Sequence, residues 1–204
     1  MSLVLWSGGC DSTLVLRDLA HEKSTKKEPV RALTIVHNQV GARREQADAR
    51  AKILAEFRDC GLHIKHIKVS IKVSGPDWAV GGGSFQAMLW LSTAVSILGK
   101  GEELYTGHCE EDSVWKRYGQ LSSALKGALS ALDKDDCEWV TPLCWESKRE
   151  IIRRLKELKL HDMCWWCESP KSGKRCGQCT PCRMHETALW QMKRWSDVKN
   201  VCGG

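Results

Sequence analysis

The sequence lacks the long apolar segments that membrane insertion and export require. No apolar run among the 204 residues approaches the roughly 20 residues that a membrane span needs. The first residues, Met1 to Trp6, have neither the basic start nor the long apolar region of a secretory signal peptide, because Ser-Gly-Gly follows directly. We therefore expect a cytoplasmic protein that does not associate with membranes.

A strong excess of one charge is also missing. The formal net charge is only +6, since 25 acidic residues are interleaved with 31 basic ones. This balance suits a phosphorylated ligand as well as it suits nucleic acid, and we expect no stable nucleic-acid complex. Internal repeats and low-complexity segments are absent too. The length predicts one α/β domain at residues 1–145 and a C-terminal helical lobe at residues 146–204.

A complete disulfide framework does not fit the cysteines. Their number, 11, is odd, and a reducing compartment disfavours disulfide bonds. Most of the scattered cysteines are expected in the core, where a free thiol packs as a small apolar group. These are Cys10, Cys60, Cys109, Cys137, Cys144 and Cys202.

The remaining cysteines cluster near the C-terminus and predict a metal site. Four of them follow a C-x8-C-x2-C-x2-C order, namely Cys167, Cys176, Cys179 and Cys182. Four thiolates at such spacing suit a tetrahedral Zn²⁺, and a set without an open position suits a structural metal. Cys164 competes with Cys167 for the first ligand position. His185 is expected to face solvent or a partner.

Two other interpretations of the cysteine cluster stay open. Cys176 and Cys179 could form a redox pair. Alternatively, a zinc ribbon could grip nucleic acid through basic side chains near the cluster. Those side chains are Lys171, Lys174, Arg175 and Arg183.

Short apolar runs alternate with helical patterns along the first two thirds of the chain. The runs predict five strands, at residues 3–6, 30–37, 67–73, 103–107 and 138–143. Alternation of strands and helices predicts a parallel five-stranded sheet with helices on both faces, a Rossmann-like α/β fold. The strict apolar-polar alternation from Ile67 to Val73 places that strand near a sheet edge. Pro76 to Ser84, with three consecutive glycines, is the segment expected to be most flexible.

A glycine-containing loop lies between the first predicted strand and the helix after it. It reads Ser7, Gly8, Gly9, Cys10, Asp11 and Ser12, with Thr13 following. Two glycines let backbone N–H groups approach an anion closely, and the helix start adds its positive dipole end and hydroxyl donors. A pyrophosphate fits this chemistry at the carboxyl end of a parallel strand.

The loop lacks the lysine of a Walker A sequence, so phosphoryl transfer in the usual P-loop manner is not predicted. Asp11 is expected instead to hold a Mg²⁺ that bridges phosphate oxygens. Either Asp11 or Ser12 is expected to cap the helix. The alternative is a tight strand-to-helix turn that binds nothing.

The loop at one end and the cysteines at the other together resemble the 7-cyano-7-deazaguanine synthase (QueC) family of PP-loop ATP pyrophosphatases. Gly107 with Asp112, and Thr141-Pro142-Leu143 followed by Ser147-Lys148, look like family landmarks between the two ends. The resemblance implies an adenine nucleotide alpha hydrolase (HUP-type) fold. It also implies an ATP-dependent carbon-nitrogen ligase of queuosine-type nucleoside biosynthesis or of 7-deazaguanine DNA modification.

The implied reaction converts 7-carboxy-7-deazaguanine, ammonia and ATP to the 7-cyano base preQ0 through an acyl adenylate. In that scheme the loop holds pyrophosphate, and Lys148 stabilises charge developing on phosphate. A solvated first-turn residue is the alternative for Lys148. Trp115, Trp165 or Trp166 could stack on a purine-like ring. The resemblance leaves a homodimer open.

Two other functions also remain. A relative could adenylate or amidate a different acceptor, such as a tRNA base, a protein terminus or a deazaguanine stopped at the amide. A nucleotide-binding protein without catalysis is the third hypothesis, and Asp11 beside the glycines argues against it.

Overall fold

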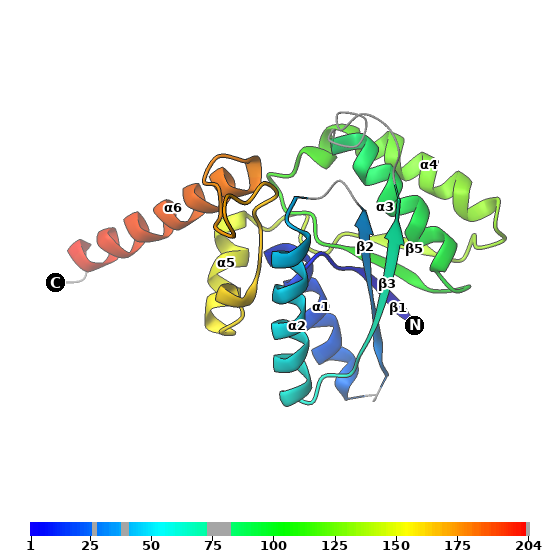
Figure 1. Cartoon of the computed structure of the whole chain (residues 1–204), viewed down its shortest axis with the longest axis horizontal. Coiled ribbons are helices and arrows are strands. Elements are labelled where there is room, and N and C mark those ends of the chain that lie inside the picture. Colours follow the sequence, from blue (N-terminus) through cyan, green and yellow to red (C-terminus); the bar gives the residue numbers. More distant parts are fainter. Residues whose placement is uncertain (26–27, 38–40, 73–82, 203–204) are drawn as a thin grey trace.

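A computed structural model of the chain describes residues 1–25, 28–37, 41–72 and 83–202. Its centre is a five-stranded parallel sheet in the order β3-β2-β1-β4-β5 (Figure 1). The strands are β1 (Ser2–Leu5), β2 (Val30–His37), β3 (Ile64–Ile71), β4 (Glu103–Thr106) and β5 (Glu138–Val140). The predicted parallel sheet is confirmed, with β3 at an edge. Most of the segment predicted to be flexible, 76–82, lies outside the described residues, as does Val73.

Helices cover both faces of the sheet (Figure 1). They are α1 (Cys10–Ser24), α2 (Arg43–Asp59), α3 (Gly83–Ile97), α4 (Tyr118–Ser130), α5 (Lys148–Glu157) and α6 (Thr180–Cys202), with short 3₁₀ helices η2 (Ser113–Arg117) and η3 (His161–Met163). One apolar cluster joins the sheet to α1, α2 and α5, and includes Leu14, Ile53 and Ile151. A second cluster joins it to α3 and α4, and includes Leu91 and Leu125.

The central strands are apolar on both sides because both faces of the sheet are covered. On β1, Leu3 belongs to one cluster and Val4 to the other, and both are fully buried. Ala32 and Leu33 repeat this arrangement on β2. Burial of a leucine or valine side chain contributes about 1.5–3 kcal/mol, so these positions favour a doubly covered sheet over a half-exposed one.

The carboxyl end of β1 is the point at which the sheet order reverses. The chain passes from β1 to β2 on one side, whereas β4 pairs with β1 on the other side. The connections therefore diverge and leave a crevice above the strand ends. Gly107, directly after β4, touches the start of α1: an added Cβ would lie 2.5 Å from the Ser12 nitrogen. A side chain at this position would push α1 away from β4.

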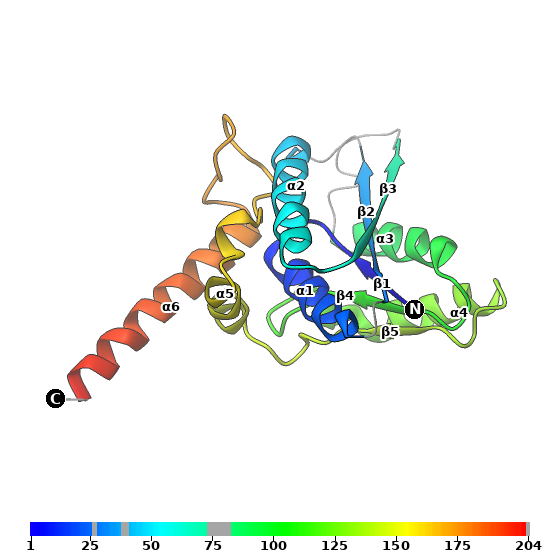
Figure 2. The same ribbon diagram turned by 90° about the horizontal axis from the view of Figure 1, so that it is seen from below.

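The C-terminal part packs on the sheet through α5. Ile151 and Leu155 of α5 belong to the same cluster as Leu14 of α1, so one core extends across residue 145. The Ser147 side chain accepts a hydrogen bond from the Glu150 N–H at 3.3 Å and caps α5. Helix α6 packs on α5 at its start and then projects away from the rest of the molecule (Figure 2).

The scattered cysteines divide between core and surface. Cys10, Cys109 and Cys137 are buried as predicted, whereas Cys60 is exposed. The side chain of Cys202 lies outside the described residues. Among the helices that the structure describes, none is both long and apolar enough to cross a membrane.

Candidate active site and metal centre

The loop between β1 and α1 turns sharply at its first glycine. Gly8 has a φ of +88°, which only glycine adopts without strain, and a Cβ there would lie 2.9 Å from the Cγ of Arg50. Helix α1 begins at Cys10, with Gly9 in the N-cap position and no side chain capping it. The prediction that Asp11 or Ser12 caps this helix is therefore wrong, because both residues lie inside its first turn.

Surrounding elements hold the loop through its carbonyl groups. Nη1 of Arg50, on α2, donates to the Ser7 carbonyl at 2.7 Å, and the N–H of Trp165 donates to the Gly8 carbonyl at 3.0 Å. Inside the loop, Ser12 Oγ accepts from the Ser7 N–H at 3.3 Å and lies 3.1 Å from Ser7 Oγ. These bonds fix the shape of the loop, and each of the two hydroxyl groups bonds the other and one backbone N–H of the loop.

Thr13 does not line the cavity beside this loop. It is fully buried, and its Oγ1 accepts a hydrogen bond from Nε1 of Trp6 at 3.0 Å. The Trp6 carbonyl in turn accepts from Oγ1 of Thr34 at 2.8 Å. Thr13 lies on the side of α1 that faces the sheet, so its hydroxyl holds β1 and α1 together.

A cavity of about 730 Å³ opens above the carboxyl ends of β1, β2 and β4. From the predicted loop it takes Ser7, Gly9, Cys10, Asp11 and Ser12. The opposite wall contains Trp165, Trp166 and Glu168, from the segment before the cysteine cluster. A cavity of this size and position accommodates a nucleotide together with a small acceptor.

Lys148 and Asp11 meet inside this cavity although they lie far apart in the sequence. The Lys148 Nζ donates to both carboxylate oxygens of Asp11, at 2.7 and 2.5 Å. Lys148 is 7% exposed, so it is not a solvated first-turn residue. Burial by itself lowers the pKa of Lys148, but the Asp11 carboxylate and other neighbouring groups together raise it by a larger amount, so the net shift is upward. Glu111 accepts from the Lys148 N–H and fixes the start of α5.

His108 occupies the cavity wall directly after β4. Its Nδ1 lies 3.2 Å from Oδ2 of Asp112, the same oxygen that accepts from the Cys109 N–H at 3.3 Å. Nε1 of Trp115 donates to the Cys109 carbonyl at 2.6 Å. Trp115 therefore braces this turn and does not line the cavity, whereas Trp165 and Trp166 do.

His37, the last residue of β2, is a buried polar residue in the same cavity. It is 3% exposed, and within the described part of the chain neither ring nitrogen has a hydrogen-bond partner. Burial, aided by the charge of Arg43, lowers the pKa of His37, so the ring is neutral at pH 7. A neutral imidazole offers one donor and one acceptor, and leaving both unpaired costs about 1–3 kcal/mol unless a ligand satisfies them.

Three residues of this site are not identified by the sequence motifs. His37 and His108 each stand at the carboxyl end of a predicted strand, where parallel sheets place ligand contacts, and that position is a usable signal. Arg50 has no such signal, because nothing in a helical pattern shows that one arginine reaches a distant loop carbonyl.

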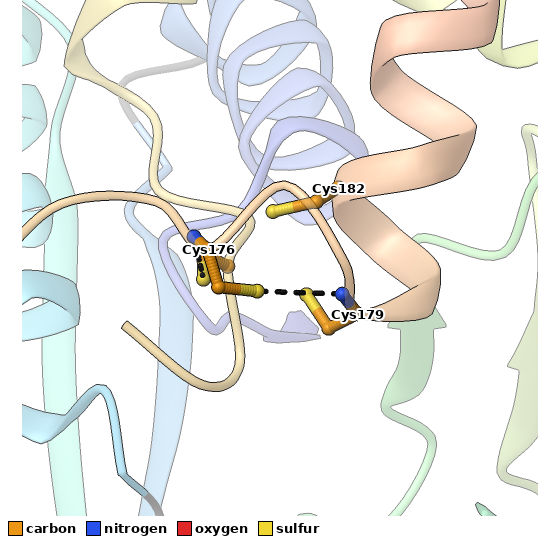
Figure 3. A group of neighbouring side chains, drawn as sticks. Cys176, Cys179 and Cys182 are labelled. Carbon is orange, nitrogen blue, oxygen red and sulfur yellow. Dashed lines mark hydrogen bonds between the residues drawn. The ribbon is translucent and has the colours of Figure 1, made fainter. Parts of the chain in front are cut away.

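The four cysteines of the predicted set come together in space. One ligand atom each from Cys167, Cys176, Cys179 and Cys182 lie within 4.8 Å of one another. Figure 3 shows the sulfurs of the last three turned toward a common centre at the start of α6. Cys164 does not take part, because its Sγ donates to the Leu160 carbonyl at 3.4 Å. Of the two cysteines that compete for the first ligand position, Cys167 therefore lies with the other three, and Cys164 does not.

Backbone N–H groups prepare this cluster for thiolates. The N–H of Cys179 points to Sγ of Cys176 at 3.3 Å (Figure 3), and the N–H of Gln178 lies 3.4 Å from the same sulfur. These bonds lower the pKa of Cys176 to about 6. Burial raises the pKa of Cys182 to about 12. A bound metal ion deprotonates such thiols, so the four sulfurs fit a metal ion.

Two residues near the cluster differ from their predicted surroundings. His185 is 1% exposed and stacks on Trp166 with ring centroids 3.5 Å apart, so the prediction that it faces solvent or a partner is wrong. Its Nε2 lies 3.0 Å from Nε2 of His161. The Arg175 guanidinium stacks over Trp166 at 3.5 Å and donates to the Cys164 carbonyl, so it serves the lobe itself. Aromatic packing outweighs solvation for both residues.

Comparison with solved structures supports the fold class. The chain superposes on the U34-tRNA thiolase NcsA from Methanococcus maripaludis, solved with its [4Fe-4S] cluster, with a TM-score of 0.52 and 16% sequence identity. The match covers 91% of this chain and 64% of the thiolase, so the chain spans less than two thirds of that protein's length. The sheet with its loop between β1 and α1 thus defines a Rossmann-like α/β protein.

The family follows from the sequence match. Residues 87–193 match the profile of the family described as queuosine biosynthesis protein QueC. Because this match covers more than half of the chain, the chain belongs to the QueC family of PP-loop ATP pyrophosphatases. No curated protein gave a significant match.

Proposed function

We propose that this chain is an ATP-dependent carbon-nitrogen ligase that adenylates a carboxylate and passes the acyl group to ammonia. Its substrate in this proposal is 7-carboxy-7-deazaguanine, and its product is 7-cyano-7-deazaguanine. The observation that carries the proposal is the Lys148–Asp11 pair, which lies in one cavity with the loop residues Ser7, Gly9 and Ser12.

The loop and the Lys148–Asp11 ion pair have different roles toward ATP in this proposal. The loop at the start of α1 binds the β- and γ-phosphates through N–H and hydroxyl groups. The substrate carboxylate attacks the α-phosphorus, pyrophosphate leaves, and an acyl adenylate forms. Lys148 supplies a fixed cation for charge that develops on the α-phosphate. Asp11 holds that cation in place and is the carboxylate that would hold a Mg²⁺ bound with the nucleotide.

Ammonia then displaces AMP and gives the amide. The amide oxygen then attacks the α-phosphorus of a second ATP, pyrophosphate leaves, and one N–H proton is lost to water. Loss of AMP together with the remaining N–H proton leaves the nitrile. The neutral imidazole of His37 bonds the polar edge of a heteroaromatic ring in the cavity. Among the described residues neither ring nitrogen of His37 has a hydrogen-bond partner, and this supports the role, since a ring ligand would satisfy both.

The cysteine cluster holds one Zn²⁺ in this proposal. Sulfurs within 4.8 Å of one another suit a single ion, because an iron-sulfur cluster would hold its four thiolates farther apart. Four thiolates leave no open position, so the zinc is structural and stabilises the segment that carries Trp165 and Trp166. Elemental analysis of the purified protein tests this: zinc near one equivalent supports the site, whereas iron with a visible chromophore contradicts it.

The reaction is tested in one mixture. Purified protein is incubated with ATP, Mg²⁺, ammonium and 7-carboxy-7-deazaguanine, and products are followed by mass spectrometry together with AMP and pyrophosphate release. The proposal expects amide and then nitrile, with one AMP for each step. Asp11→Ala is expected to abolish AMP release while the protein stays folded. Turnover of ATP with no change in the deazaguanine would contradict the substrate.

A tRNA base is the second candidate acceptor. The observation that favours it is the exposed basic segment that directly follows Pro170 of the cavity wall, with Lys171, Lys174 and, on α6, Arg183. Reaction with unmodified tRNA in place of the deazaguanine separates the candidates. Pyrophosphate release that depends on tRNA, weakens with salt and falls in Lys171→Ala would favour this acceptor.

A further inference from the structure

The turn after β4 carries a histidine-carboxylate pair that faces the reaction cavity. His108 lines the cavity, as do Asp11 and Lys148. The His108 Nδ1 is engaged by Asp112 Oδ2 at 3.2 Å. Because the carboxylate accepts the proton on Nδ1, the other ring nitrogen, Nε2, carries the lone pair.

Aromatic neighbours and backbone bonds hold this pair in one orientation. Trp115 and Trp139 pack edge-on against the His108 ring, with centroids 6.1 and 6.4 Å away and interplanar angles of 79° and 84°. Asp112 is fixed by the Cys109 N–H at 3.3 Å. A ring held on two sides by tryptophans and at Nδ1 by a carboxylate cannot turn its Nε2 freely.

From this geometry we infer that His108 is the general base that deprotonates the ammonia donor, and that Asp112 is its positioning residue. The inference rests on the proposed ligase function. Ammonia at neutral pH is mostly ammonium, which has no lone pair to attack a carbonyl carbon. The site therefore needs a proton acceptor beside the acyl adenylate, and Nε2 of His108 supplies one.

The step balances as follows. Ammonium gives one proton to Nε2 of His108, and the freed ammonia attacks the acyl carbon. A C–N bond forms while the C–O bond to AMP breaks, and AMP leaves with the electron pair. The new amide nitrogen then releases its extra proton to water. The Asp112 carboxylate stabilises the imidazolium that forms at His108.

Hydroxylamine provides the test, because it is mostly unprotonated at neutral pH and needs no base before it attacks. The experiment uses His108→Gln with 7-carboxy-7-deazaguanine, ATP and either ammonium or hydroxylamine. We expect amide formation to fall about 100-fold or more, within the range for loss of a general base, while hydroxamate formation stays at the wild-type rate. Substrate-dependent exchange of labelled pyrophosphate into ATP should also stay unchanged. His21→Gln, an exposed histidine on α1, is the matched control.

Asp112→Asn should show the same selectivity, losing amide formation and keeping hydroxamate formation. An equal fall with both nucleophiles, or no fall with either, overturns the inference, since a general structural effect does not distinguish them. Absence of pyrophosphate exchange in the wild-type protein overturns the proposed function and the inference with it. Normal exchange with an unselective His108→Gln overturns the inference alone.

Discussion

Replacing Lys148 by methionine should destabilise the protein because it leaves Asp11 with an unpaired buried charge. Methionine keeps the length and apolar stem of the side chain, so packing against α1 changes little. The Lys148 Nζ now bonds both oxygens of Asp11, and the two side chains are 9% and 20% exposed. Breaking a buried pair costs about 3–5 kcal/mol, and the remaining exposure of Asp11 favours the lower end, about 3 kcal/mol.

A second substitution, at Asp11, should restore most of the lost free energy of unfolding. Asp11→Asn removes the charge that Lys148→Met strands, so the double variant is expected within about 1 kcal/mol of the wild type. The measurement is the free energy of unfolding from urea titrations of wild type, both single variants and the double variant. For a domain of this size, 3 kcal/mol corresponds to about 6–12 °C in Tm.

The same cycle can refute this reasoning. A coupling energy below about 0.5 kcal/mol is the value of a solvent-exposed ion pair. Such a result would mean that water reaches Lys148 and Asp11 freely and that the cavity does not isolate them. Arg153→Met, at an exposed ion pair with Glu150 on α5, is the control and should leave the free energy of unfolding close to the wild-type value.

Three further predictions concern the loop, the metal and pH. Gly107→Ala should raise the KM for ATP and destabilise the protein by about 1–3 kcal/mol, since its Cβ would meet the Ser12 backbone at 2.5 Å; Gly127→Ala, at an open position on α4, is the control for unfolding and ATP kinetics. Cys179→Ser should release the metal and lower Tm, as measured by elemental analysis and calorimetry, and unchanged metal content would contradict its place in the cluster. His185, whose pKa burial lowers to about 3, stays neutral in the folded state, so the unfolded chain takes up a proton as pH falls below about 6.5. The free energy of unfolding should therefore fall by about 2 kcal/mol between pH 6.5 and pH 5 in the wild type. Urea titrations of His185→Phe should not show this fall.

The parts of the fold that could be predicted are those with short-range causes. Apolar runs and their alternation with helical patterns identify five parallel strands, and the polar alternation from Ile67 marks the edge. The strand limits shift by up to three residues, as for β3, which begins at Ile64. The first turn of α1 is predicted less well, because the residue at the N-cap position is Gly9, which has no side chain to cap the helix.

The candidate site follows the same rule. Its parts formed by residues close in sequence could be predicted, and its parts formed by distant residues could not. The cysteine cluster could be predicted from spacing, since Cys176, Cys179 and Cys182 lie close in sequence. The pairing of Asp11 with Lys148 spans 137 residues, and no local pattern predicts that distance. The burial of His185 could not be predicted from the sequence, because it depends on the Trp166 ring that stacks on the histidine from another segment.

The hydrogen bond from the Trp165 N–H to the Gly8 carbonyl connects the cysteine cluster to the loop between β1 and α1. Trp165 is two residues from Cys167, so a change in the sulfur cluster reaches the nucleotide loop through a very short stretch of backbone. If the four cysteines hold a metal as proposed, its loss would leave the sheet intact and weaken the contact between Trp165 and the loop. Under the proposed function, ATP turnover would then fall at a metal concentration that still leaves the protein folded.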